Sequence, residues 1–240
     1  MNNAMNTPGT VPEDWPRFYR QQAQQVEEGC LQAFYREGVL DPNTAIGQAP
    51  MVAMDFETTG LDAEQAEIVS IGIVPFDMRR IYCRQSCHWV VKPENELHEA
   101  SIVIHGITHS DIEEAPRLHS ILDQLLSLIA GKLVVVHYRY MEREFMRRAI
   151  DELLGEVLLF PVLDTMEIER RILRKQQSWG QKVLNRPLAS LRLGDSRRRY
   201  HLPHYSVHNA LTDALSTAEL LQAQVSHHFS RDLPIHALWN

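Results

Sequence analysis

Apolar residues in the first half of the chain gather in short runs that are separated by turn residues. These runs predict three strands, over residues 51–56, 68–76 and 81–91. The segments between the runs are short enough to join neighbouring antiparallel strands directly. This half of the sequence therefore predicts an antiparallel meander.

The pattern changes to helical spacing after Pro93. A helix is predicted over about 118–129, where apolar residues recur at helical intervals and stop before Gly131. The remaining predicted elements are strands over 133–136 and 162–163 and helices over about 141–154, 165–175, 188–193 and 207–224. A meander followed by alternating strands and helices predicts an α/β fold, in which a mixed five-stranded sheet is flanked by helices on both faces.

The chain is predicted to have four parts. Residues 1–12 are polar and contain two prolines, which favours a disordered tail. Residues 13–50 form an N-terminal helical extension and linker, residues 51–226 form the main domain, and residues 227–240 form a C-terminal tail. The extension can contact a partner, pack on the main domain or support a dimer, and the sequence leaves these three roles open.

Composition favours a protein of the cytoplasm that does not enter a membrane. The chain has 240 residues, of which 44% are hydrophobic and 23% charged, as is ordinary for a globular protein. No apolar run approaches the roughly 20 residues needed to cross a bilayer, and the N-terminus lacks the pattern of a secretion signal. Cys30, Cys83 and Cys87 are too few for a disulfide framework and are predicted to be reduced thiols.

Charge is distributed unevenly along the chain. The net charge is −7, yet residues 170–199 contain ten basic residues and one acid, so the remainder carries −16. A concentration of this kind is expected of a surface that binds a phosphate backbone. For any single one of these residues, the alternative is an ordinary solvated helix face.

Two acids follow the first predicted strand at a spacing that points to a cation. Asp55 and Glu57 are two residues apart, and side chains at this spacing point to the same face of a strand. Two adjacent carboxylates repel each other, and a divalent metal between them relieves the repulsion. The alternative is a strand that runs into a polar turn, with both acids solvated.

Further acids occur where other predicted elements begin or end. Glu142 lies in the first turn of a predicted helix, and Asp213 lies near the start of the last one. Each follows a histidine by five positions, His137 and His208 respectively. If the last helix contains both His208 and Asp213, the two side chains are about 140° apart around it and can flank one site. Asp164 is a further acid at a strand end.

Motifs in a defined order connect these residues to a known family. They are Asp55 to Gly60 (DFETTG), Pro93 with His105 to Thr108 (HGIT), His137 to Glu142 (HYRYME) followed by Phe145 and Met146, and His208 to Ala214 (HNALTDA). On these residues the chain resembles the DEDD-type, DnaQ-like 3′→5′ exonucleases of the RNase H-like fold, in the subgroup with a histidine in its third motif (DEDDh). The resemblance covers residues 51 to about 224.

The second motif departs from the family pattern. The family generally has Asp where this chain has Glu142, whose side chain is longer by one methylene. Glu142 is therefore expected to bind metal through a shifted helix, through water, or not at all, since metal sites tolerate little positional error. Glu144 is two residues too late for the spacing and is a weaker candidate.

The resemblance implies a catalytic set and its cofactor. Two divalent ions, Mg²⁺ or Mn²⁺, are expected, because ligation by oxygen alone favours these metals. The implied metal ligands are Asp55, Glu57, Glu142 and Asp213. His208 is the implied general base, because the pKa of histidine is close to neutral. The alternative for an isolated histidine at this position is a helix cap or a core residue.

The resemblance also implies a substrate and its contacts. The expected reaction is hydrolysis of phosphodiester bonds at the 3′ ends of single-stranded DNA or RNA. Thr58, Gly60 and Leu61 are implied to hold the terminal nucleotide, with Leu61 wedged against the last base, and His137 to line the same pocket. The alternatives are a tight turn and a structural histidine. A polymerase partner and a homodimer are both open.

Two other functions remain compatible with the sequence. One is a catalytically degenerate nucleic-acid-binding protein on the exonuclease fold, which the unusual Glu142 would suit. The other is a phosphodiesterase of short oligonucleotides. DNA and RNA both stay open as substrates, because no motif here reads a 2′-hydroxyl.

Overall fold

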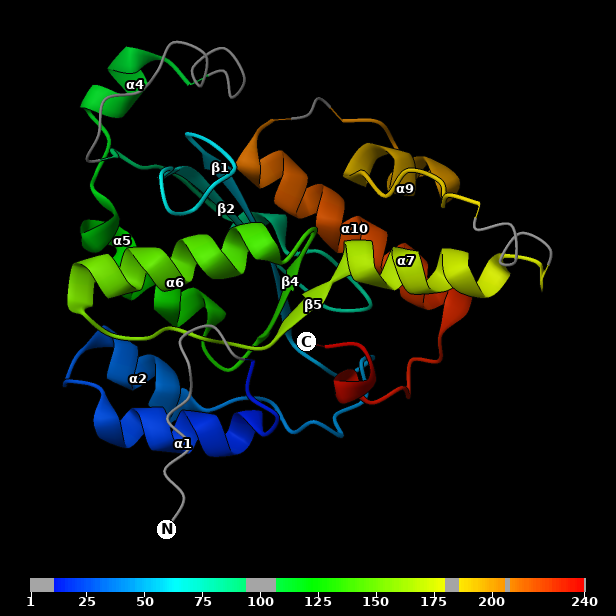
Figure 1. The fold of residues 1–240 in the computed structure, drawn as a ribbon, viewed down its shortest axis with the longest axis horizontal. Coiled ribbons are helices and arrows are strands. Elements are labelled where there is room, and N and C mark those ends of the chain that lie inside the picture. Colours follow the sequence, from blue (N-terminus) through cyan, green and yellow to red (C-terminus); the bar gives the residue numbers. More distant parts are fainter. Residues whose placement is uncertain (1–10, 94–106, 180–185, 206–207, 240) are drawn as a thin grey trace.

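A five-stranded mixed sheet forms the centre of the computed structural model, which describes residues 11–93, 107–179, 186–205 and 208–239. The strand order is β3-β2-β1-β4-β5 (Figure 1). The strands are β1 (Met51–Thr58), β2 (Ile68–Phe76), β3 (Cys87–Val90), β4 (Leu133–Val136) and β5 (Val162–Asp164). β2 is antiparallel to its neighbours β1 and β3, whereas β4 is parallel to its neighbours β1 and β5. The predicted mixed sheet is confirmed.

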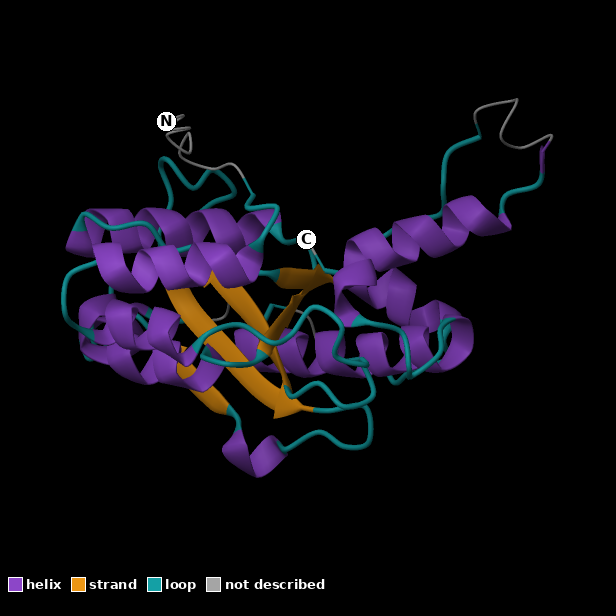
Figure 2. Ribbon diagram, turned by 90° about the horizontal axis from the view of Figure 1, so that it is seen from below, coloured by secondary structure: helices purple, strands orange, loops and turns teal. Residues whose placement is uncertain are grey.

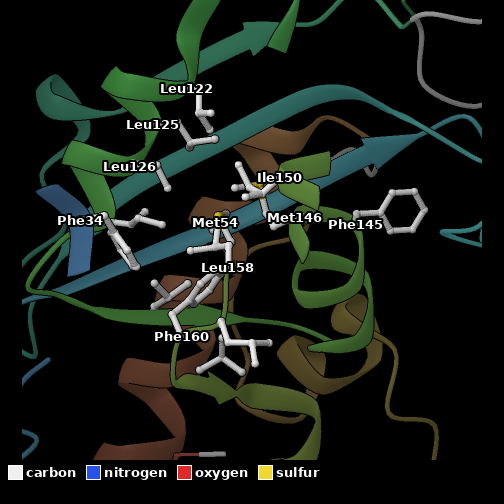
Figure 3. Close-up of a cluster of buried hydrophobic side chains, with 14 of the residues drawn as sticks. Phe34, Met54, Leu122, Leu125, Leu126, Phe145, Met146, Ile150, Leu158 and Phe160 are labelled. Atoms are coloured by element: carbon white, nitrogen blue, oxygen red, sulfur yellow. The ribbon is translucent and has the colours of Figure 1, made fainter. Parts of the chain in front are cut away.

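Helices cover both faces of the sheet (Figure 2). Because side chains alternate along a strand, Val52, Met54 and Phe56 of β1 join one apolar cluster, and Met51 and Ala53 join another. The first cluster includes side chains of α5 (Leu118–Ile129) and α6 (Tyr140–Leu154); the second includes those of α7 (Thr165–Gln176) and α10 (Ala210–His228). Figure 3 shows Met54 among side chains of α5 and α6.

Two N-terminal helices pack on the first of these clusters. They are α1 (Trp15–Gln25), whose first turn is capped by the side chain of Asp14, and α2 (Cys30–Glu37). Their aromatic rings meet edge to face, with centroids of Tyr19 and Tyr35 5.0 Å apart. The hydroxyl of Tyr35 donates to the carbonyl of Val157 and accepts from the amide of Leu159, which ties α2 to the chain entering β5.

The C-terminal residues also pack against the main domain. In the segment after α10, the carbonyl of Leu233 accepts from the backbone amide of Ile46, and the carbonyl of Arg231 accepts from the backbone amide of Gly47. A short 3-10 helix, η2 (Ile235–Ala237), then buries Ile235 completely. Residues 1–10, most of the predicted disordered tail, lie outside the described residues.

Two predicted elements differ from the structure. The strand predicted over 81–91 is wrong in extent, because the 3-10 helix η1 (Cys83–Gln85) precedes β3. The helix predicted over 188–193 is wrong: residues 186–191 form no helix, and α9 covers Leu193–Arg199. The carbonyl of Leu191 accepts from His137 and Ser196, so tertiary contacts replace helical ones there.

A short helix, α4 (His109–Glu113), had no counterpart among the predicted elements. It begins with a capping box, in which the side chain of Thr108 accepts from the amide of Asp111 and Asp111 accepts from the amide of Thr108. In the part of the chain that the structure describes, no helix is both long and apolar enough to span a bilayer.

Candidate active site

Three carboxylates converge at the end of the central strand. Asp55 and Glu57 come from one face of β1, and Asp213 comes from the first turn of α10. One oxygen from each lies within 4.8 Å of the oxygens of the other two. Residues that are remote in sequence thus form one acidic cluster.

A glycine on the neighbouring strand allows α10 to reach this position. Gly72 of β2 lies directly opposite Asp55 in the antiparallel register. A Cβ atom on Gly72 would lie 2.2 Å from the carbonyl oxygen of Ala210, the first residue of α10. The helix therefore begins in direct contact with the sheet backbone, which places Asp213, one turn later, beside the acids of β1.

His208 lies just outside α10, whereas the sequence predicted that it would share the helix with Asp213. It precedes the cap residue Asn209 and has a φ of 71°, a left-handed conformation. Its backbone amide donates to Oδ2 of Asp213 over 3.1 Å. This bond fixes the histidine next to the acidic cluster, and its side chain is exposed at the mouth of the site.

Glu142 faces the cluster from the first turn of α6. It is 2% exposed, and its Oε2 has no hydrogen-bond partner among the described residues. Burial raises the pKa of Asp55, and the charge of Glu142 raises it further, ahead of the charges of Asp213 and Glu57. Glu142 is not part of the group whose oxygens all lie within 4.8 Å of one another, although its charge weighs more on Asp55 than the charges of the other two acids.

The charge of this site is suited to a divalent cation. Burial raises the pKa of Glu142 well above its usual range, and burial also raises the pKa of Asp213. A cation that lies among the acids stabilises their charged forms. The donors are all carboxylate oxygens, one of them buried without a partner, and this set fits hard ions such as Mg²⁺ or Mn²⁺.

His137 serves the scaffold, which corrects its predicted place in a substrate pocket. Its Nε2 donates to the carbonyl of Leu191 over 3.0 Å, and its Nδ1 lies 2.8 Å from Oγ1 of Thr165. Both ring nitrogens are therefore engaged within the protein, and burial lowers the pKa of this histidine to about 4. The ring joins the end of β4 to α7 and to the segment before α9.

Asp164 is also structural. Its carboxylate caps α7 by accepting from the amide of Met166, and it accepts from the amides of Tyr138 and Arg139. An ion pair of 3.5 Å with the Arg139 side chain completes its contacts. This acid organises the β4–α6 turn that leads to Glu142.

The turn after β1 is held by its own threonines. Oγ1 of Thr58 donates to the carbonyl of Gly60, and Oγ1 of Thr59 accepts from the amide of Glu67. Leu61 at the tip is 81% exposed. The turn is thus fixed at its base and presents one apolar side chain to solvent beside the acidic cluster.

Five arginines of the basic region at residues 170–199 form ion pairs with acids, and phosphate binding by this region stays a prediction. Arg199 contacts the buried Glu169 over 2.7 Å, and Arg197 contacts Glu219 over 2.7 Å. Ion pairs also hold Arg170 and Arg171 to Glu167 and Arg198 to Asp195. These contacts connect α7, α9 and α10, and sequence charge alone does not show such partners.

Sequence reasoning missed Gly72 and the pair formed by Ser70 and His88. The Oγ of the buried Ser70, which pairs across the strands with Glu57, lies 2.8 Å from Nε2 of His88 on β3. Burial lowers the pKa of His88, whereas the charge of Glu57 raises it. The signal for Gly72 was present, because a glycine inside a strand often marks a close backbone approach.

The mixed five-stranded sheet flanked by helices matches the RNase H-like fold of exonucleases. A family model described as an exonuclease (RNase_T) matches residues 52–221. The chain therefore belongs to this family of nucleases. The predicted resemblance to DnaQ-like exonucleases is confirmed.

Curated relatives agree with the family. The chain is 30% identical over 181 residues to a "DNA polymerase III PolC-type" protein of Thermotoga maritima, which covers 75% of this chain but only 12% of that protein. It is 26% identical over 176 residues to a "DNA polymerase III subunit epsilon" of Treponema pallidum, covering 73% of this chain and 76% of the relative.

Solved structures share the fold at low sequence identity. The nuclease domain of 3′hExo, a DEDDh family member bound to rAMP, has a TM-score of 0.60 at 14% identity, over 75% of this chain and 93% of that one. Cell-death related nuclease 4 has a TM-score of 0.63 at 19% identity, over 76% and 65%. These likenesses show the fold.

Proposed function

We propose that the protein is a metal-dependent 3′→5′ exonuclease that removes nucleotides from single-stranded ends of DNA or RNA. The observation that carries the proposal is the convergence of Asp55, Glu57 and Asp213 within 4.8 Å, with the buried Glu142 beside them. No core function explains four acids gathered at one end of a sheet, because the charges of the other three oppose the ionisation of the buried Asp55.

The acids are proposed to hold two divalent ions, Mg²⁺ or Mn²⁺. Such a pair, when bound, activates a water and stabilises the leaving 3′ oxygen of a phosphodiester. Asp55, Glu57 and Asp213 supply the grouped oxygens, and Glu142 supplies its unpartnered oxygen directly or through water.

His208 is the proposed general base. Its backbone bond to Asp213 keeps it next to the acids, and its exposed side chain can pass a proton to solvent. An imidazole nitrogen can accept the proton that the attacking water loses.

The names of relatives support the polarity and the substrate class. One neighbour is described as a 3′-exonuclease that recognises histone mRNA, and another as Exonuclease I of E. coli in complex with a dT13 oligonucleotide. The epsilon relatives are subunits of a DNA polymerase by name, so a polymerase is a proposed partner for this chain. Leu61, exposed beside the acids, is the proposed wedge against the terminal base.

Digestion of single strands labelled at one end tests the proposal. The wild type, incubated with Mg²⁺ or Mn²⁺, is expected to shorten 5′-labelled strands stepwise from the 3′ end and to be inactive with EDTA. Asp213→Asn and Glu142→Gln remove ligand charge at nearly constant shape and are expected to lower kcat by at least about 100-fold. Asp151→Asn, on the exposed side of α6, is the matched control and should retain activity.

Each alternative gives a different result. Binding of strands without hydrolysis, and with no effect of either substitution, identifies a degenerate nucleic-acid-binding protein. Faster turnover of dinucleotides than of long strands identifies a phosphodiesterase of short oligonucleotides. Release of nucleotides from the 5′ end contradicts the proposed polarity.

A further inference from the structure

Two tyrosines stand exposed beside the acidic cluster. Tyr138 is 46% and Tyr140 44% exposed; Tyr138 lies in the turn after β4, and Tyr140 is the first residue of α6. Because β4 is parallel to β1, with Ala53 opposite Val135, this turn emerges at the same edge of the sheet as Asp55. The amide of Met141 donates to the carbonyl of Tyr138, so this tyrosine is within one turn of Glu142.

The two rings form a pair. Their centroids are 5.9 Å apart and their planes are inclined by 34°. Large aromatic side chains are usually buried, since each can remove much apolar surface from water. Two exposed ones in contact form an apolar surface for which the described part of the fold supplies no cover.

The backbone holds Tyr138 in a strained conformation. Its φ is 86°, a region that bulky residues rarely adopt. The amide of Tyr138 donates to Asp164, as does the amide of Arg139, so the buried acid pins the turn in this shape. Strain of this kind is maintained by the surrounding structure and is concentrated at ligand-binding sites.

We propose that Tyr138 and Tyr140 form a stacking platform for a base of the single strand whose phosphate occupies the acidic cluster. The inference rests on the proposed function and adds to it a contact with the base. Aromatic side chains stack on any base, because every base has a π-face. The platform therefore favours a single strand, whose bases are unstacked, over a duplex, without selecting a sequence.

The arrangement around the cluster favours a nucleic acid over a protein partner. In the strand order β2-β1-β4, the β1–β2 turn with Leu61 flanks the end of β1 on one side, and the tyrosines flank it on the other. An apolar contact on each side of a phosphate-binding site matches a strand in which bases and phosphates alternate. Arg139, between the two tyrosines, adds a partly exposed positive charge.

Fluorescence of 2-aminopurine provides a direct test of stacking. The probe is an oligothymidylate with 2-aminopurine at one of its last few positions, in deoxyribose and ribose forms. It is bound with Mg²⁺ to an Asp213→Asn parent, in which hydrolysis is expected to be blocked. Tyr138→Asn removes one ring while suiting the positive φ, since asparagine tolerates that region. Tyr140→Ala removes the other ring.

The parent is expected to quench the probe at one or two adjacent positions. Each ring-removing substitution should weaken binding about fivefold or more and restore fluorescence at those positions. Tyr138→Phe and Tyr140→Phe should behave as the parent, because stacking needs the ring and not the hydroxyl. Leu154→Ala, which removes an equally exposed apolar side chain at the other end of α6, is the control and should change nothing.

Unchanged binding and quenching in both ring-removing variants would refute the proposed platform. Phe variants that bind the probe as weakly as the ring-removing variants would refute it too. A wild type that digests strands while these variants bind normally rejects the platform alone. A wild type that neither binds nor digests strands rejects the proposed function with it. Quenching with only one sugar form assigns the platform to that nucleic acid.

Discussion

Replacement of Gly72 by alanine tests whether the contact between α10 and the sheet assembles the site. A Cβ at this position would lie 2.2 Å from the carbonyl oxygen of Ala210, 2.3 Å from its carbonyl carbon and 2.5 Å from the amide nitrogen of Leu211. All three are backbone atoms, so no side-chain rotation relieves the overlap. The first turn of α10 must move away from β2, or β2 must bend.

The size of this movement follows from ordinary contact distances. Relief of the overlap from 2.2 Å to the 3.4 Å at which ordinary van der Waals contact begins requires a shift on the order of 1 Å. Asp213, in the same turn of helix, moves with it and leaves the group formed with Asp55 and Glu57. A misplacement of about 1 Å in a catalytic site can cost about 100-fold in rate. Overpacking of this kind also costs about 1–3 kcal/mol in the free energy of unfolding.

The assay combines activity, metal binding and stability. We expect Gly72→Ala to lower kcat for strand digestion by about 100-fold and to lower Tm by about 3–10 °C for a chain of this length. Stabilisation of the protein by Mn²⁺ should decrease as well, since the carboxylates no longer converge. Gly194→Ala is the matched control, because a Cβ there meets nothing within 4 Å, and it should keep wild-type activity.

The result that refutes this reasoning is specific. If Gly72→Ala keeps wild-type kcat and Tm, the close approach of α10 to β2 does not set the position of Asp213. If it loses Tm but keeps kcat and the response to Mn²⁺, the strain is absorbed elsewhere and the helix start stays in place.

Three further predictions concern charge. Asp55→Asn should raise the Tm of the metal-free protein at neutral pH. Because the pKa of Asp55 is raised, the contribution of this group to stability is complete below about pH 4 and is lost as the pH rises through the raised pKa. An unchanged or lower Tm contradicts this prediction. In the wild type, Mn²⁺ at about 100 times its Kd should add about 2.7 kcal/mol, as thermal unfolding with and without EDTA will show; no shift contradicts the metal site. Arg199→Ala should cost about 3 kcal/mol by urea unfolding, because it leaves Glu169 buried without its cation, whereas Arg198→Ala, in an exposed pair, should cost at most about 1 kcal/mol.

The strongly periodic parts of the fold were predictable from the sequence. The strands at 68–76 and 133–136 and the helix at 118–129 were predicted with the bounds that the structure has. In each of these three segments the apolar positions follow the period of a strand or of a helix from end to end, because the whole element packs against the core. Where tertiary hydrogen bonds decide the backbone, as at Leu191, periodicity carries no such information.

The candidate site was predictable in its acids and less so in its other groups. The two-residue spacing of Asp55 and Glu57 fixes their common face, and the motif order adds Asp213 and Glu142. The internal role of His137 depends on Thr165 and Leu191, which no spacing rule connects to it. In the basic region, the partner of Arg199 is Glu169 and that of Arg197 is Glu219, and both acids lie on other helices, to which no spacing rule connects the arginines.

The acidic cluster exists because separate parts of the fold hold each acid in place. β1 carries Asp55 and Glu57 in the stretch that pairs with β2, so they cannot move apart without breaking this pairing. Core contacts of Phe145 and Met146 anchor the helix that carries Glu142, and the close approach at Gly72 seats the helix that carries Asp213. The repulsion is therefore sustained by packing elsewhere, which leaves the site ready to gain stability from a cation. The packing that holds the acids together therefore explains both why the fold tolerates their charges and why the site can bind a metal ion.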